Sequence, residues 1–274
     1  MKTIKIADIV LFLDLIHEDE FKSLSKYELP PHKIEPPKYV IFTDPDYPIM
    51  IPDFEPIHTE FYDLYEMAGS TLQVQKENGK ITGYILYHRD EIVLVPLVDT
   101  FWMEYLLSQY AISYIMSKNN ALILHGSSFI YKGMGIILSA KSGTGKSTHS
   151  RLWQKYENVV VINDDKNILK IEEDEIICYG SPWSGKHMID NNTKAPLKAI
   201  VFLYQNKDNV IEELTPMEAF KRLIGQLVLP TKENQDLWNK IMDKLISLPV
   251  YSLGCNMEIE AYLTLKERLD LLCH

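Results

Sequence analysis

The feature that most constrains this chain is a short glycine-containing segment that follows an apolar run. Residues 139–148 read SAKSGTGKST and come directly after MGIIL. The apolar run predicts a buried strand, and glycines after it permit backbone angles that other residues avoid. The residues from Lys146 onward favour a helix. A strand, a glycine turn and a helix in this order indicate an α/β fold.

The spacing Ala140-x4-Gly145-Lys146-Ser147 matches a phosphate loop except at its first position, where glycine is usual. Glycines in left-handed conformation allow successive N–H groups to point at oxyanions, and the helix start adds its positive dipole end. We therefore predict that the segment binds ATP or another nucleoside triphosphate with Mg²⁺. The residues expected to hold the nucleotide are Ser142, Gly143, Thr144, Gly145, Lys146, Ser147 and Thr148.

A pair of acids ends the next apolar stretch. VVVIN runs into Asp164-Asp165, and so apolar a strand is expected to be central in its sheet. Its carboxyl end should then lie beside the phosphate loop. One carboxylate can hold Mg²⁺ while the other accepts a proton from an attacking hydroxyl. The alternative is a solvated turn in which Asp165 caps a local group.

Composition excludes several other classes of protein. The chain has 274 residues, 46% of them hydrophobic, and a formal charge of −10, which argues against broad nucleic-acid binding. Three scattered cysteines indicate neither disulfides nor zinc. No run reaches the roughly 18 apolar residues of a membrane span, and the N-terminus does not resemble a signal peptide. We expect a cytoplasmic protein with no nucleic-acid or membrane partner.

The pattern changes along the chain and predicts two domains. Residues 1–98 are mostly strand-like, with a proline-containing connector at 29–39 and a hairpin signal at Asn78-Gly79. A helical period over 100–118 opens the second part, residues 99–274, in which strands and helices alternate. The expected architecture is an α/β domain built on a mixed sheet with a phosphate loop, preceded by a smaller β-rich domain.

A later helix shows three start signals together. Thr215 is a cap, Pro216 follows it, and Glu218 lies three residues after the cap. We expect this helix to run to Pro230. The residues expected on its buried face are Met217, Phe220, Ile224 and Leu227. Two further helices are predicted near 233–247 and 257–272.

Three segments together resemble a known family. LHGSSF at 124–129, the loop AKSGTGKST and the strand end VINDD follow one another as in the HPr kinase/phosphorylase family and the related ATP-dependent phosphoenolpyruvate carboxykinases. The resemblance covers roughly residues 120 to 230. It implies phosphoryl transfer, with Asp164 as base, Asp165 and Ser147 as metal ligands, and His125 beside the transferring phosphate.

The chain also departs from that family. Ala140 replaces the opening glycine, Lys141 replaces a frequent acid, and the N-terminal part does not match the regulatory domain. The arginine motif that binds HPr is not apparent. We therefore expect the acceptor to be a serine hydroxyl of another peptide or small protein, such as a ribosomally made modified peptide. The enzymes of that family are oligomers, so the resemblance also allows a homo-oligomer for this chain.

Some assignments remain alternatives. The segment SPWSGKH at 181–187 is either a lid whose Lys186 neutralises transition-state charge or a surface loop anchored by Trp183. Arg151, one turn beyond the loop, is expected to be solvated. For the whole chain, a nucleotide-dependent switch without an acceptor and a carboxykinase-like enzyme acting on a small acid are the alternatives to a kinase.

Overall fold

The chain folds into two compact units. The computed structural model describes residues 1–32, 35–141, 143–185, 187–227, 234–256 and 258–273. The units are Met1–Ile115 and Met116–His274. Their division falls later than the expected boundary at 98/99, because most of the helix after that boundary packs on the N-terminal sheet.

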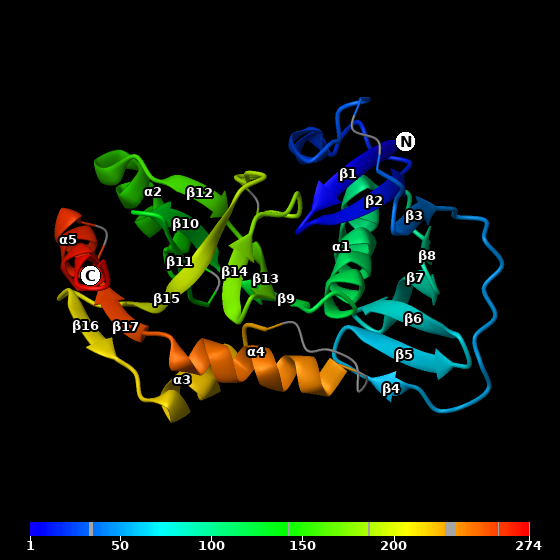
Figure 1. Cartoon of the computed structure of the whole chain (residues 1–274). Coiled ribbons are helices and arrows are strands. Elements are labelled where there is room, and N and C mark those ends of the chain that lie inside the picture. The colour runs from blue at the N-terminus through cyan, green and yellow to red at the C-terminus, as the bar shows by residue number, and fades with distance from the viewer. Residues whose placement is uncertain (33–34, 142, 186, 228–233, 257, 274) are drawn as a thin grey trace. The chain divides into compact units, whose positions relative to one another are not determined.

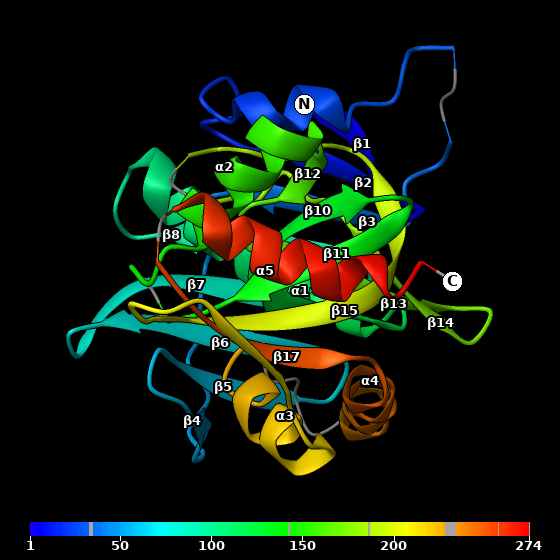
Figure 2. The same ribbon diagram turned by 90° about the vertical axis from the view of Figure 1, so that its left-hand side faces the viewer.

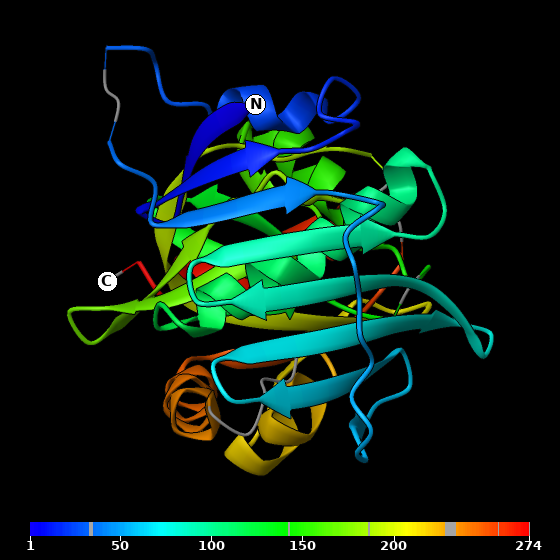
Figure 3. The ribbon, with the colours of Figure 1, turned by 90° about the vertical axis from the view of Figure 1, so that its right-hand side faces the viewer.

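The first unit contains an eight-stranded mixed sheet in the order β1-β2-β3-β8-β7-β6-β5-β4 (Figure 3). The pairs β2–β3 and β3–β8 are parallel and the others antiparallel. The elements are β1 (Lys2–Ile6), β2 (Ile9–Asp14), the 3-10 helix η1 (Lys22–Lys26), β3 (Tyr39–Thr43), β4 (Ile57–His58), β5 (Tyr62–Met67), β6 (Ser70–Glu77), β7 (Lys80–His88), β8 (Glu91–Pro96) and α1 (Phe101–Ser117).

Two-residue turns set the register of this sheet. Asn78 and Gly79 both have positive φ, 50° and 75°, so the predicted hairpin between β6 and β7 is confirmed. Ala7 and Asp8 make the same kind of turn, with φ of 48° and 65°. They fold the stretch IKIADIVLFLDL, predicted only as strand-like, into the hairpin β1–β2.

Helix α1 packs on the sheet of the first unit. A side chain at Gly83 would come within 3.0 Å of Leu107, so this glycine lets the helix lie close. The buried carboxylate of Glu104 accepts hydrogen bonds from the backbone N–H groups of Ile16 and His17, each at 2.8 Å, and so ties the end of β2 to the helix. None of the described helices is both long and apolar enough to cross a membrane.

The second unit contains a nine-stranded sheet with the order β12-β10-β11-β15-β14-β13-β9, and β17 lies beside β15 and β16. The elements, coloured green to red in Figure 1, are β9 (Ala121–His125), β10 (Ser127–Tyr131), β11 (Met134–Ser139), α2 (Lys146–Glu157), β12 (Val160–Asn163), β13 (Lys166–Glu172), β14 (Glu175–Tyr179), β15 (Lys194–Gln205), β16 (Val210–Glu213), α3 (Pro216–Leu223), α4 (Gln235–Ser247), β17 (Val250–Cys255) and α5 (Ile259–Asp270).

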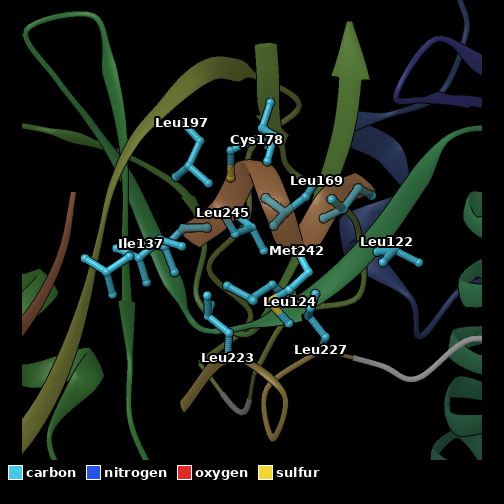
Figure 4. Packing of buried hydrophobic residues seen from close by; sticks show 14 of the residues in the cluster. Leu122, Leu124, Ile137, Leu169, Cys178, Leu197, Leu223, Leu227, Met242 and Leu245 are labelled. Atoms are coloured by element: carbon cyan, nitrogen blue, oxygen red, sulfur yellow. The ribbon is translucent and has the colours of Figure 1, made fainter. Parts of the chain in front are cut away.

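Helices cover both faces of this sheet, which explains its nearly all-apolar strands. In β11, Ile137 belongs to a core with Leu223, Met242 and Leu245 of the α3–α4 side (Figure 4). Its neighbours on the strand, such as Ile136, belong to a second core that includes residues of α2 and α5. Figure 2 shows α5 lying across that second face. The mixed α/β architecture predicted from the sequence is therefore what the chain adopts.

Two predictions about elements were wrong. The strand that ends at Asn163 was predicted to be central, but it lies at one end of the strand order. The strand is apolar because both of its faces are buried: Ile162 belongs to one core and Val161 to the other. The capping box at Thr215 is present, but α3 ends at Leu223. Its buried residues are Ala219 and Leu223; of the predicted face, Leu227 is buried and Phe220 packs against the same core, whereas Met217 and Ile224 are exposed.

Candidate functional site

The loop between β11 and α2 has the backbone of an anion cradle. Gly143 and Gly145 have positive φ, 79° and 119°. A side chain at either glycine would meet nothing within 4 Å, so it is the backbone angle that favours glycine. Ala140 is not among the described residues with positive φ, and it is buried in the core with Leu138 and Trp153. Alanine is therefore accommodated where the usual pattern has glycine.

The start of α2 is open to a ligand. Gly145 is the N-cap and no side chain accepts a hydrogen bond from the first turn, so backbone N–H groups there remain available to an oxyanion. Lys146 donates from Nζ to the carbonyl oxygen of Ala140 at 2.9 Å, inside the loop. Burial lowers the pKa of Lys146, an effect that the charge of Asp165 partly offsets.

The strand order brings the acid pair to this loop. Strand β10 lies between β11 and β12 and is antiparallel to both. The two outer strands therefore run in the same direction, and their carboxyl ends meet at one edge of the sheet. A cavity of about 450 Å³ opens there, and its lining includes His125, Lys146, Ser147, Asp164 and Asp165.

Asp165 is held as an ionised carboxylate. His125 Nε2 lies 2.8 Å from its Oδ1, and Lys166 Nζ lies 3.4 Å from its Oδ2. Burial alone would raise the pKa of Asp165, but the His125 hydrogen bond and the Lys166 charge outweigh it and hold the pKa below its usual range. A charged oxygen ligand is suited to a magnesium ion.

Asp164 lies in a different environment. Its side chain is 7% exposed, and its Oδ1 accepts a hydrogen bond from the backbone N–H of Gly185 at 2.6 Å. Burial raises the pKa of Asp164; the Gly185 amide offsets this in part, and the charge of Asp165 adds to it. Neighbouring carboxyl groups whose pKa values are displaced in opposite directions are suited to separate roles.

Asn163 joins the acid pair to the segment that covers it. Its Oδ1 accepts from the backbone N–H groups of Asp165 and Lys166 at 2.8 and 2.7 Å. Its Nδ2 donates to the carbonyl oxygens of Ser181 and Trp183 at 2.8 and 3.1 Å. The side chain is fully buried. Sequence reasoning missed this residue; its only signal was an amide directly before two acids.

A second buried amide fixes the position of His125. Asn167 donates from Nδ2 to the carbonyl oxygen of Gly126 at 2.6 Å, and Gly126 donates from its N–H to the carbonyl oxygen of Asp165 at 2.9 Å. A side chain at Gly126 would lie 2.8 Å from Ile137 and 2.9 Å from the carbonyl oxygen of Leu138. The glycine in LHGSSF is therefore needed for close packing.

Most of the residues predicted for the site line this one cavity. Gly143, Gly145 and Thr148 contribute to its wall together with the side chains named above, and Thr144 lines a neighbouring cavity. Ser142 and Lys186 lie outside the described residues. Arg151, expected to be solvated, and His187, which was assigned no role, also line the cavity.

Magnesium fits the donors present. In the part of the chain that the structure describes, no three His, Cys, Asp or Glu side chains group as a metal cage. Magnesium does not need one, because it is commonly held by one or two carboxylates with the remaining positions taken by phosphate and water. The Ser147 hydroxyl and the Asp165 carboxylate on the cavity wall are such donors.

Comparisons with known proteins give a weak structural likeness. No family model and no curated protein matches the chain. Among solved structures it is similar to the Hpr(Ser) kinase/phosphatase from Coxiella burnetii, with 12% identity and a TM-score of 0.33, over 54% of this chain and 97% of that one. Similarity at this level says nothing about chemistry, so function is inferred from the site itself.

Proposed function

We propose that this protein is an ATP-dependent phosphotransferase that moves the γ-phosphate to a serine hydroxyl of a peptide or small protein. One observation carries the proposal: the glycine loop and two carboxyl groups with oppositely displaced pKa values line the same cavity. A structural turn would need neither the open helix start nor a buried acid with a raised pKa. The pairing of both is typical of a site that binds phosphate and removes a proton.

The residues divide the work as follows. Backbone N–H groups around Gly143 to Lys146 bind the phosphates, and the Lys146 ammonium neutralises their charge. Asp164 accepts the proton of the serine hydroxyl as its oxygen bonds to the γ-phosphorus. The bond from that phosphorus to the β–γ bridging oxygen breaks, and ADP leaves. Ser147 and Asp165 would hold Mg²⁺, which supplies positive charge to the phosphate oxygens.

His125 supports this arrangement from the side. Its hydrogen bond keeps Asp165 ionised, so that carboxylate does not compete with Asp164 for the substrate proton. The Gly185 amide donates to Oδ1 of Asp164, and we assign the proton transfer to the other oxygen, Oδ2. The raised pKa of Asp164 makes it a stronger base than an exposed aspartate.

The test is transfer of label from γ-labelled ATP in the presence of Mg²⁺ to peptides encoded beside the gene, read by mass spectrometry. We expect phosphate on one serine and loss of transfer by about 10²-fold or more in Asp164→Asn, with nucleotide binding retained. The exposed Asp174, replaced by Asn, is the matched control. Hydrolysis without an acceptor would favour a switch module, and transfer coupled only to oxaloacetate would favour a carboxykinase.

A further inference from the structure

A second cavity lies on the other side of the glycine loop. It measures about 530 Å³, and its walls include Thr144, His149 and Leu152 from the loop and helix α2. Gln205 and Cys255, at the ends of β15 and β17, form the opposite wall. Strands β11, β15 and β17 are mutually parallel, so their carboxyl ends, the loop and this cavity share one edge of the sheet.

His149 is the unusual group in this cavity. It is 3% exposed; the backbone of Ala261 lies near the ring, but neither ring nitrogen makes a well-formed hydrogen bond within the described residues. Burial lowers its pKa to about 4, and the backbone of Ala261 offsets only part of that. The ring is therefore neutral at physiological pH and offers one donor and one acceptor. A buried polar group without a well-formed hydrogen bond is costly, and a ligand that supplies one would offset that cost.

We propose that this second cavity binds the nucleoside part of the nucleotide, with His149 as a hydrogen-bonding group and Leu152 as an apolar wall for the base. The inference rests on the proposed function, because it requires a phosphate chain on the loop. It assigns the direction of the bound nucleotide: the nucleoside on the side of His149, and the γ-phosphate on the side of Asp164.

The two cavities are placed for a single ligand. Both are lined by Gly143, Gly145 and Thr148, so a phosphate chain that crosses the loop reaches from one to the other. The volume of the second cavity falls within the range of roughly 300 to 1,000 Å³ that is usual for small-molecule sites. Its mixture of an aliphatic wall with amide and imidazole groups suits a heteroaromatic base, which needs both stacking and edge hydrogen bonds.

The cysteines of the wild-type chain provide a direct test. Cys255 is partly exposed and lines the second cavity, Cys273 is exposed, and Cys178 is buried. Alkylation is followed residue by residue by mass spectrometry, with no ligand, with inorganic tripolyphosphate, or with the non-hydrolysable β,γ-imido analogue of ATP. At a ligand concentration about ten times its Kd, we expect the analogue to slow alkylation of Cys255 about tenfold. Cys273 should react at an unchanged rate, and tripolyphosphate should not protect Cys255.

Substitutions supply an independent measurement. His149→Phe keeps an aromatic ring and removes both nitrogens; we expect it to weaken binding of the ATP analogue by about tenfold while leaving tripolyphosphate binding unchanged. Leu152→Trp fills the cavity and should have the same selective effect, which keeps the test available if the histidine variant does not fold. Gln154→Ala, at an exposed position of the same helix, is the control and should bind both ligands normally.

The outcomes separate this inference from the proposed function. If tripolyphosphate binds and the ATP analogue binds no more tightly, or if both cavity variants bind the analogue normally, the nucleoside assignment is overturned while the phosphate loop stands. If Cys255 is protected equally by both ligands, the assignment is overturned as well. If neither ligand binds the wild-type chain, the proposed function fails and this inference fails with it.

Discussion

His125 Nε2 and Asp165 Oδ1 lie 2.8 Å apart, although one residue ends β9 and the other follows β12. Strand pairing explains the contact: β9 and β13 are antiparallel neighbours, and His125 lies opposite Lys166, the residue after Asp165. The sheet register thus sets the distance between the imidazole and the carboxylate. Because the contact is fixed by backbone pairing, it is present before any ligand binds.

Replacing His125 with glutamine tests what this contact does. Glutamine keeps a hydrogen-bond donor but cannot carry a positive charge, so the pKa of Asp165 should rise toward its usual value. Asp164, with its raised pKa, sets the acid limb of the pH–rate profile, so the change at Asp165 should show in the metal requirement. As pH is lowered, the Mg²⁺ concentration for half-maximal rate should begin to rise at a higher pH in the variant than in the wild type. A uniform loss of rate with an unchanged pH dependence of the Mg²⁺ requirement would contradict a charge-based role.

Asn163→Asp should damage the site more than its small chemical change suggests. The new carboxylate would face the carbonyl oxygens of Ser181 and Trp183, to which the amide now donates. A buried charge against two acceptors is expected to cost about 3 kcal/mol in the free energy of unfolding, measured by urea denaturation. Asn191→Asp is the control: Asn191 also donates to a backbone oxygen, that of Val161, but it is only partly buried. Equal losses in both variants would contradict a special role for Asn163.

Gly126→Ala should displace His125 and lower stability. Its new methyl group would lie 2.8 Å from Ile137 and 2.9 Å from a backbone oxygen, and backbone cannot move aside cheaply. We expect a loss of about 1–3 kcal/mol in urea denaturation, with a larger relative loss of phosphoryl transfer. Gly225→Ala, where a side chain would meet nothing within 4 Å, should be close to neutral. Normal stability in the Gly126 variant would show that the local packing relaxes more easily than the structure indicates.

Local sequence predicted the parts of the fold that are determined by a few adjacent residues. The two-residue turn at Asn78-Gly79 and the capping box at Thr215 depend on side chains within three positions of each other, and both are present. The strand–loop–helix around Gly145 is of the same kind, since positive φ and the helix start are local properties.

The features that the sequence did not predict depend on contacts between residues far apart along the chain. Strand β12 looks central because both of its faces are buried, yet face burial does not determine how many neighbours a strand has. The buried amide of Asn163 is recognisable only once the segment after Ser181 is known to pass over it. The cavity beside His149 requires the ends of β15 and β17, which no motif connects to the loop.

Nucleotide binding should weaken as pH rises. The weakening should begin at a lower pH than at a site whose lysine has its usual pKa. Burial lowers the pKa of Lys146 in the free protein, whereas bound phosphates stabilise the ammonium and raise that pKa. Binding is then linked to proton uptake, so affinity falls as pH rises through the free-state pKa, by at most about tenfold per pH unit. Calorimetric titration with the non-hydrolysable ATP analogue in buffers of different ionisation enthalpy measures both the affinity and the protons taken up.

Lys146→Arg is the matched control, because its guanidinium stays charged throughout. The affinity of this variant for the analogue should be lower but independent of pH. A wild-type protein whose affinity is as flat as that of the arginine variant would show that Lys146 is not the group that meets the phosphates.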